Sequence, residues 1–280
     1  MAPTTSRPQI GKFDDGQIYV YAGHHNTRKH RSPYISLENQ TKLRITVAPL
    51  DLSSGNAPDD GPRFVEPVPW DEMNDFVEST RPWETFSDLK PLREDQDVSK
   101  DPYARWAQSH RFHEGENMYR VLSRYAQEFP QADSPVVPAE LRSAYYLDYQ
   151  WLTLSFTVSE DASKPHTCAF LTDSVPLSSD LLSTGETSVA FGLTKLQRLQ
   201  DDYNSHRYIP ATIFSASDRQ IRIIQCWHDK QNPKALHIRL SPIMDFRDGA
   251  RGNWKDWITV LCWIAGKPVG DTKNGSETIP

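Results

Sequence analysis

The sequence predicts an α+β fold, with an antiparallel or mixed sheet of about six to seven strands and helices packed on one face. Two observations support this prediction. The last third of the chain consists of three apolar, strand-like runs followed by a tryptophan-rich stretch with helical spacing. The runs are joined by short polar turns, which favour antiparallel neighbours over a doubly wound sheet.

The C-terminal elements give the clearest pattern. Two apolar, β-branched runs, Tyr208–Ser215 and Ile221–Trp227, flank the polar turn Ser217–Arg219. Leu236–Leu240 follows as a third strand, and apolar residues then recur at helical spacing over Trp254–Ala265. This unit is therefore predicted as an antiparallel meander that ends in a helix.

The N-terminal elements are predicted from shorter patterns. Gln17–Ala22 reads as a short strand, and the basic segment His24–Arg31 after it reads as a loop. Lys42–Ala48 alternates between apolar and polar residues, which predicts a half-buried strand. The residues from Pro49 to Pro69 are rich in proline and aspartate, which is typical of an irregular connection.

The middle of the chain predicts three helices, a helical turn and a hairpin. Asp71–Ser79 is a short helix, and Asp101–Phe129 is a longer one that opens with an Asp-Pro cap and stops before a proline. Ala139–Tyr146 is predicted as a helical turn. A hairpin, Leu147–Ser159 with Thr167–Thr172, and an amphipathic helix, Leu193–Tyr203, complete the order.

The chain of 280 residues is predicted to form one domain spanning residues 1–280. The alternative is a boundary near residue 135, marked by two prolines, between a proline-rich wrapping region (9–135) and a core of sheet and helices (139–268). The ends, 1–8 and 270–280, are polar and are expected to be flexible tails.

Composition excludes several classes of protein. The net charge of −6 gives no footprint for nucleic acid, and no run approaches the ~18 apolar residues that span a bilayer, so neither partner is expected. Three cysteines without a CxxC pair predict no disulfides. The N-terminus lacks the apolar core of a signal peptide, so we expect an intracellular, cytoplasmic protein. The oligomeric state cannot be inferred.

Motifs for common cofactors and for catalysis are absent. The sequence has no GxGxxG, Walker-type, HExxH, GxSxG or EF-hand pattern, which excludes the enzyme classes that these motifs define. We therefore expect no cofactor and no resident metal. Enzymes whose sites are dispersed along the sequence remain open.

A polar group ends the strongest predicted strand. His228 and Asp229 follow the run Ile221–Trp227, and a rigid strand end is a suitable mount for acid–base residues. The reference pKa of histidine lies near neutrality, so His228 is the acid–base candidate. Asp229 and Tyr149 complete the predicted catalytic set. A hydrogen-bonded histidine at a strand end is the structural alternative.

Aromatic residues are frequent and concentrated in two places. Four aromatic residues fall within seven positions from Tyr145, and three tryptophans lie on or beside the last helix. The core accounts for many of these rings, but an aromatic-lined pocket for an apolar or planar molecule is the functional alternative. The predicted ligand-binding residues are Tyr145, Tyr146, Trp151, Trp227, Trp254 and Trp257.

Two groups of residues carry ion-binding side chains without forming a recognisable site. His110, His113 and Glu114 have helical i, i+3, i+4 spacing and are expected on one exposed helix face. The loop from His24 to His30 has basic neighbours that repel a metal cation and suit an anion. Whether either group binds an ion cannot be decided from the sequence.

A third set of acids lies at predicted strand ends. Asp148, Glu160 and Asp173 occupy such positions, which suit metal-dependent phosphodiester chemistry and are also common in soluble proteins. Leu193–Ala265 resembles, in layout, the tail of PD-(D/E)XK-type nuclease domains, because a helix bearing Gln197 precedes a β-hairpin and a helix. The E-x-K strand of that family is missing at the expected place after Asp148.

Three functions follow from these patterns. The leading one is a protein that handles a small apolar or aromatic molecule in an aromatic-lined pocket, as a cofactor-free acid–base enzyme of isomerase, cyclase or lyase type or as a binder. The second is a non-catalytic protein-interaction module. The third is a divalent-metal phosphodiesterase. Whether the protein is an enzyme, and the identity of its ligand, are beyond the sequence.

Overall fold

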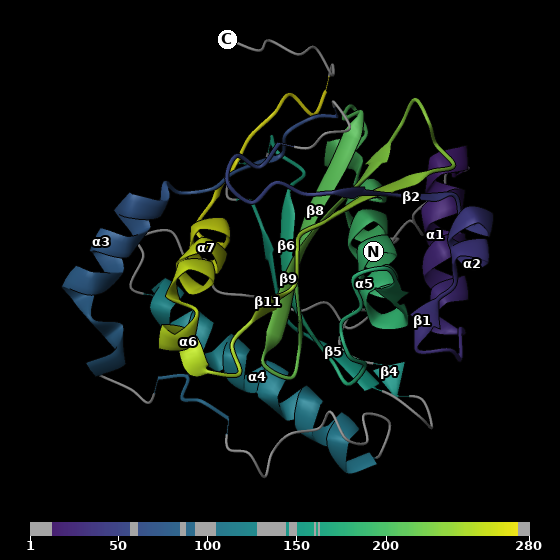
Figure 1. Ribbon diagram of the computed structural model, residues 1–280. Helices are drawn as coiled ribbons and strands as arrows, with labels where there is room; N and C mark the ends of the chain where they lie inside the picture. The colour runs from purple at the N-terminus through teal and green to yellow at the C-terminus, as the bar shows by residue number, and fades with distance from the viewer. Residues whose placement is uncertain are drawn as a thin grey trace, which may run out of the picture.

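The structure is a computed structural model, which describes residues 13–56, 61–84, 88–92, 105–127, 144–145, 150–159, 161 and 163–273 (127, 144 and 145 as backbone only). Its centre is a mixed sheet of seven strands in the order β2-β10-β9-β8-β6-β5-β4, with an additional short strand, β11, on β9 (Figure 1). The pairs β2–β10 and β6–β8 are parallel and the others are antiparallel. The predicted α+β class and mixed sheet are confirmed.

The strands of this sheet are β2 (Ile45–Pro49), β4 (Ala144–Tyr145), β5 (Gln150–Val158), β6 (Thr167–Asp173), β8 (Tyr208–Ser217), β9 (Gln220–Asp229), β10 (Leu236–Leu240) and β11 (Met244–Asp245). Two small ladders join β1 (Tyr34–Ile35) to β7 (Leu182–Ser183) and β3 (Val65–Glu66) to β12 (Lys267–Pro268). The helices are α1 (Asp15–Arg28), α2 (Leu37–Lys42), α3 (Trp70–Thr80), α4 (Arg105–Gln127), α5 (Thr184–Arg198), α6 (Gly249–Gly252) and α7 (Trp254–Ile264), with 3-10 turns η1 (Pro82–Glu84) and η5 (Asp201–Tyr203).

Helices cover both faces of the sheet, whereas the sequence predicts helices on one face. Helices α1 and α5 pack on one side, and α3, α4 and α7 pack on the other (Figure 1). The cause is visible in β8, where every residue is buried and neighbours such as Ile213 and Phe214 belong to different core clusters. A strand that is apolar on both sides requires a cover on both sides.

The N-terminal prediction is wrong at Gln17–Ala22, which lies within helix α1 and not in a strand. Asp14 caps the helix by accepting a hydrogen bond from the backbone N–H of Gln17, whose side chain accepts one from Asp14 N–H in return. The predicted basic loop at 24–31 is also helical as far as Arg28. Buried residues at helical spacing, Gly16, Val20, Gly23 and Thr27, place this helix against its neighbours.

Other boundaries differ from the predictions in ways that local chemistry explains. The predicted strand Lys42–Ala48 begins only at Ile45, because Lys42 ends helix α2 and Arg44 has a left-handed backbone with φ of 52°. Helix α5 starts at Thr184, nine positions before the predicted Leu193, and ends at Arg198. Ser183 caps it by accepting from Glu186 N–H, in a reciprocal capping box.

Most of the remaining predicted elements agree with the structure within a few residues. The hairpin of β5 and β6 is antiparallel, and the helices predicted at 71–79, 101–129 and 254–265 are α3, α4 and α7 within the described residues. Residues 144–145, predicted as part of a helical turn, form strand β4. Residues 139–143 and 146 of that turn lie outside the described residues.

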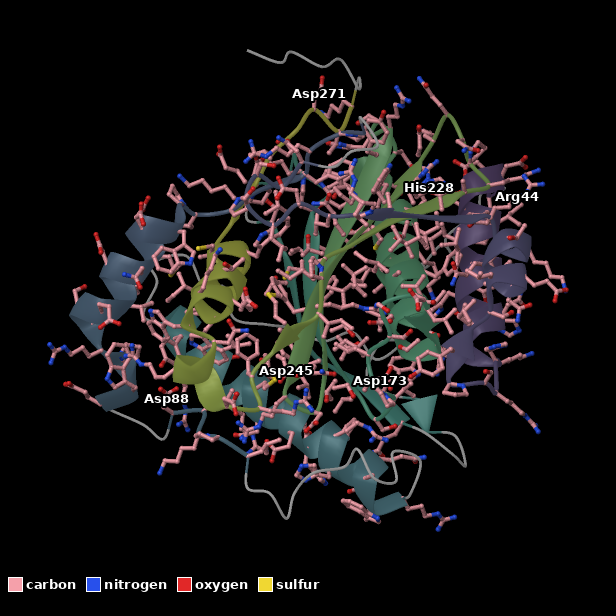
Figure 2. All side chains as sticks on the ribbon, viewed as in Figure 1. Arg44, Asp88, Asp173, His228, Asp245 and Asp271 are labelled. Atoms are coloured by element: carbon pink, nitrogen blue, oxygen red, sulfur yellow. The ribbon has the colours of Figure 1, made fainter. Side chains whose placement is uncertain are left out.

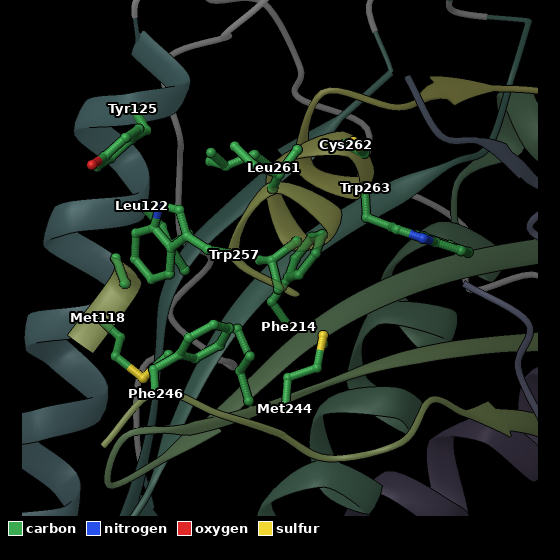
Figure 3. Close-up of a cluster of buried hydrophobic side chains, with 14 of the residues drawn as sticks. Met118, Leu122, Tyr125, Phe214, Met244, Phe246, Trp257, Leu261, Cys262 and Trp263 are labelled. Atoms are coloured by element: carbon green, nitrogen blue, oxygen red, sulfur yellow. The ribbon is translucent and has the colours of Figure 1, made fainter. Parts of the chain in front are cut away.

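Two hydrophobic clusters form the core. One surrounds Trp257, which is completely buried and packs against Tyr125 and Phe246 with its ring plane at 77° and 82° to theirs (Figure 3). The other lies between α5 and the opposite face of the sheet. Each cluster combines residues from both sides of position 135, such as Met118 with Trp257, which favours the single-domain alternative. The division itself remains a prediction.

The segment after α7 is fixed against β8. The carbonyl oxygen of Thr272 accepts hydrogen bonds from the backbone N–H groups of Arg207 and Tyr208, and its side chain bonds His206. The first residues of the predicted tail 270–280 therefore belong to the folded unit. Residues 274–280 and the other predicted tail, 1–8, lie outside the described residues. All three cysteines have free thiols. None of the described helices is long and apolar enough to cross a membrane.

The contact between α1 and α5 depends on a glycine. A Cβ atom at Gly23 would lie 2.3 to 2.7 Å from ring carbons of Phe191, which is completely buried and has no space to retreat. We expect Gly23→Ala to destabilise the fold by up to about 2 kcal/mol, because the ~1–3 kcal/mol cost of overpacking outweighs the ~1 kcal/mol gain in helix propensity. Denaturant unfolding measures this. Asn26→Ala, at an exposed position of the same helix, should be neutral or stabilising, and equal effects would contradict the packing.

Candidate functional site

His228 lies inside the protein at the upper end of the sheet (Figure 2). Its side chain is fully buried, its Nε2 donates a hydrogen bond of 3.0 Å to the carbonyl oxygen of Pro233, and its ring stacks on Tyr19. Burial lowers the pKa of His228, which opposes protonation near neutral pH. The backbone of Gly16 covers the ring. An acid–base role for His228 remains a prediction.

Asp229 is held in an ion pair on the other side of the strand. Arg207 donates two hydrogen bonds of 3.0 Å to its carboxylate, and the backbone N–H of Gln231 donates a third. Burial raises the pKa of Asp229, but the Arg207 guanidinium and the Gln231 N–H together outweigh burial, and the pKa lies below its ordinary value. The carboxylate thus fixes the turn after β9. Tyr149, the third predicted catalytic residue, lies outside the described residues.

The predicted ligand-binding tryptophans are divided among separate clusters. Trp257 belongs to the cluster under α7, with Trp254 at its edge, whereas Trp151 belongs to the cluster on the opposite face of the sheet. Trp227 forms a third cluster with Phe64 and carries the Arg239 guanidinium 4.4 Å above its ring. The described rings therefore lie in three separate clusters and do not line one pocket. The side chains of Tyr145 and Tyr146 lie outside the described residues.

The three residues predicted on one face of α4 have different partners. His110 Nε2 lies 3.9 Å from a carboxylate oxygen of Asp218, and His113 bonds Glu116 on its own helix. Glu114 forms an ion pair with Arg219. Within the described residues no three His, Cys, Asp or Glu side chains come close enough to hold a metal ion.

The histidines of the predicted basic loop are also dispersed. His24 is buried, with Nδ1 3.3 Å from Lys195 Nζ, and burial together with that ammonium group lowers the pKa of His24 to about 3. His25 is exposed, and His30 Nε2 donates a hydrogen bond to the carbonyl oxygen of Tyr34. The three rings therefore do not converge on an anion or a metal.

Asp173 is the one described member of the third acid set, since Asp148 and Glu160 lie outside the described residues. It ends β6 at the lower end of the sheet, far from His228 (Figure 2). It is completely buried and accepts hydrogen bonds from Ser183 Oγ (2.7 Å) and Val175 N–H (2.9 Å). Burial raises the pKa of Asp173 to about 7.

A buried ion pair beside Asp173 escaped the sequence analysis. Glu186, in the first turn of α5, accepts hydrogen bonds from Arg222 of β9, and both side chains are at most 1% exposed. Arg222 also donates to the carbonyl oxygens of Ser178 and Leu181, at 2.6 and 3.0 Å. The pair ties the loop between β6 and α5 to the sheet. The Ser-x-x-Glu pattern from Ser183 was its only local signal.

A surface groove of about 480 Å³ lies where the N-terminus of α1, the C-terminus of α5 and the turn after β9 meet. This volume lies within the range of small-molecule sites. The lining combines two apolar side chains, two carboxylates, two amides and one ammonium group: Phe13, Leu199, Asp14, Asp201, Gln17, Asn204 and Lys230. Lys230 directly follows the predicted pair His228 and Asp229, so the groove lies beside the predicted strand end, and none of its lining residues is among the site residues predicted from the sequence.

Fixed contacts between the two helix ends form the wall of the groove at Asp14. Its carboxylate accepts a 2.6 Å hydrogen bond from Arg198, whose side chain is 1% exposed. Gln17 donates from its side-chain amide to the backbone carbonyl oxygen of Arg198 at 3.2 Å. Since the α1 cap and the α5 C-terminus are joined by these contacts, the groove is formed before any ligand arrives.

The opposite wall carries one acid and one base around Asn204. The Asn204 side chain donates to Asp201 at 3.2 Å, and Lys230 Nζ donates to the Asn204 carbonyl oxygen. Among the ion pairs of the described residues, none joins Asp201 to Lys230. Both side chains are exposed, so each retains capacity for a group of opposite charge.

The fold and the groove define a mixed α+β protein with a preformed polar groove beside one end of its sheet, lined by both acidic and basic side chains. The chain matches no family model, no curated protein and no solved structure.

Proposed function

We propose that this protein binds a small zwitterionic molecule with an apolar or aromatic side group in the groove beside the end of β9. The observation that supports this most is the composition of the lining: an acid and a base that are not paired with each other, next to two apolar side chains. Few convergent polar groups in a concave apolar setting are typical of a small-molecule site.

The charges of the lining specify the ligand. Asp14 is neutralised by Arg198, which leaves Asp201 and Lys230 as the groups that a ligand can engage. An ammonium group of the ligand pairs with Asp201, and a carboxylate pairs with Lys230. Phe13, 48% exposed, and the half-buried Leu199 supply apolar surface for the remaining part of the molecule.

A matched series of three probes tests this proposal: L-phenylalanine, 2-phenylethylamine, which lacks the carboxylate, and 3-phenylpropionate, which lacks the ammonium group. Calorimetry or ligand-observed NMR gives the three dissociation constants. We expect L-phenylalanine to bind about three- to tenfold more tightly than either single-charge probe, since a partly exposed charged hydrogen bond contributes about 1 kcal/mol.

Two variants locate the charged contacts. Asp201→Asn should weaken binding of the two amines and leave 3-phenylpropionate unchanged, whereas Lys230→Met should weaken only the two carboxylates. Asp202→Asn and Lys234→Met change the same charges beside the groove without touching its lining. Equal binding of all three probes, or equal effects of Asp201→Asn and Asp202→Asn, would contradict the proposal.

A further inference from the structure

A cluster of two tryptophans and a carboxylate lies on the opposite side of the sheet from the groove. Trp83 of η1 and Trp254 of α7 have ring centroids 6.0 Å apart and planes at 87°, so their faces form two walls of a corner. The guanidinium carbon of Arg251 lies 4.0 Å from the Trp83 centroid and 3.9 Å from the Trp254 centroid. Glu78 of α3 closes a third side, where its carboxylate accepts a 2.8 Å hydrogen bond from Arg251.

The corner is fixed and reachable from solvent. The Trp254 indole N–H donates to Asn74 Oδ1 at 2.9 Å, which orients the ring and leaves its face to the cation. Arg251 and Glu78 are 46% and 45% exposed. Helix α3 carries four acids, Asp71, Glu72, Asp75 and Glu78, and no Lys or Arg, so its surface attracts cations.

We propose that Trp83, Trp254 and Glu78 form a cage for a quaternary or methylated ammonium cation, and that Arg251 occupies this cage as an internal competitor. Two perpendicular π faces and one carboxylate are the composition that binds such cations. A tetraalkylated ammonium ion is weakly hydrated and needs no directed hydrogen bonds, so it loses less than a primary amine does on entering. Binding then requires Arg251 to swing into solvent, which lowers the apparent affinity of the wild-type chain.

Removal of Arg251 therefore tests the cage. Tetramethylammonium chloride is titrated into the wild type and into Arg251→Ala, with tryptophan fluorescence and NMR as readouts, and uncharged tert-butanol serves as the probe of similar shape. We expect saturable binding of tetramethylammonium to Arg251→Ala, about tenfold tighter than to the wild type. Arg251→Gln, which keeps most of the side-chain length without the charge, should also bind more tightly than the wild type.

Lys255→Ala is the matched control, because it removes one positive charge close to Arg251 in the sequence, from the first turn of α7, and among the described cation–ring contacts only Arg251 lies over the two tryptophans. It should bind tetramethylammonium like the wild type. Trp254→Leu combined with Arg251→Ala should abolish the gain. If Arg251→Ala binds no more tightly than Lys255→Ala, or binds tert-butanol equally well, the Arg251 sandwich is a clasp between α3 and α7 and not a ligand cage.

Discussion

Arg222→Met is expected to destabilise the protein by about 3–5 kcal/mol, because it leaves the Glu186 carboxylate buried without its partner. The substitution also removes the donors to the carbonyl oxygens of Ser178 and Leu181, so the loop before α5 loses its attachment to β9. Urea unfolding at neutral pH measures the loss.

A control variant and a double variant distinguish the loss of a buried ion-pair partner from the loss of a positive charge alone. Lys42→Met breaks the exposed pair with Glu38, whose side chain is 76% exposed, and should leave the stability almost unchanged. Arg222→Met combined with Glu186→Leu removes both charges and should recover much of the stability. A small loss for Arg222→Met alone would show that the pair is not buried as described.

Asp173→Asn is expected to change how stability depends on pH. The pKa of the Asp173 carboxyl is about 7 in the folded protein, against an ordinary 3.8, so the folded state binds more protons between these values. Asp173 therefore contributes stability that is present below about pH 4 and is lost as the pH rises through 7. Relative to the wild type, Asp173→Asn should gain up to about 4 kcal/mol between pH 4 and pH 8.

The quantity to compare is the difference in unfolding free energy between Asp173→Asn and the wild type at each pH. Burial lowers the pKa of His24 to about 3 and of His166 to about 4. The stability that these two histidines contribute to the fold is therefore lost as the pH falls, which is opposite to the effect of Asp173 in the wild type. Their contributions cancel in the difference. Asp180→Asn, an exposed carboxylate in the same loop, should give a curve parallel to the wild type. A parallel curve for Asp173→Asn as well would contradict the raised pKa.

The strands of the C-terminal meander could be predicted because their pattern is local. Tyr208–Ser217 and Gln220–Asp229 are apolar, β-branched runs with a polar turn between them, and the two runs pair with each other directly across that turn. The same runs explain the incorrect prediction of helices on one face. A continuously apolar strand sequence does not by itself indicate that helices cover both faces of the sheet.

Helices α1 and α5 could not be read from periodicity. Gln17–Ala22 contains Ile, Val and two Tyr, which favour a strand locally, but the cap at Asp14 and the packing of Gly23 on Phe191 determine a helix. Helix α5 is buried on nearly all sides between α1 and the sheet, so it shows little apolar–polar alternation before Leu193. The signals that remained were the two capping boxes.

The groove was out of reach of the sequence for a related reason. Its lining comes from three segments, around Phe13, Leu199 and Lys230, that only the tertiary fold brings together. Strand-end position drew attention to His228 and Asp229, next to Lys230, but these two side chains are engaged in holding the fold. Frequent tryptophan indicated a pocket, whereas the described rings mostly fill the core.

A crystal structure of the protein soaked with saturating L-phenylalanine tests the central proposal most directly. The groove predicts the ligand ring against Phe13 and Leu199, its ammonium group within hydrogen-bond distance of Asp201, and its carboxylate at Lys230. Electron density for the ligand at another place, or a groove that stays empty at saturating concentration, would contradict the proposed function.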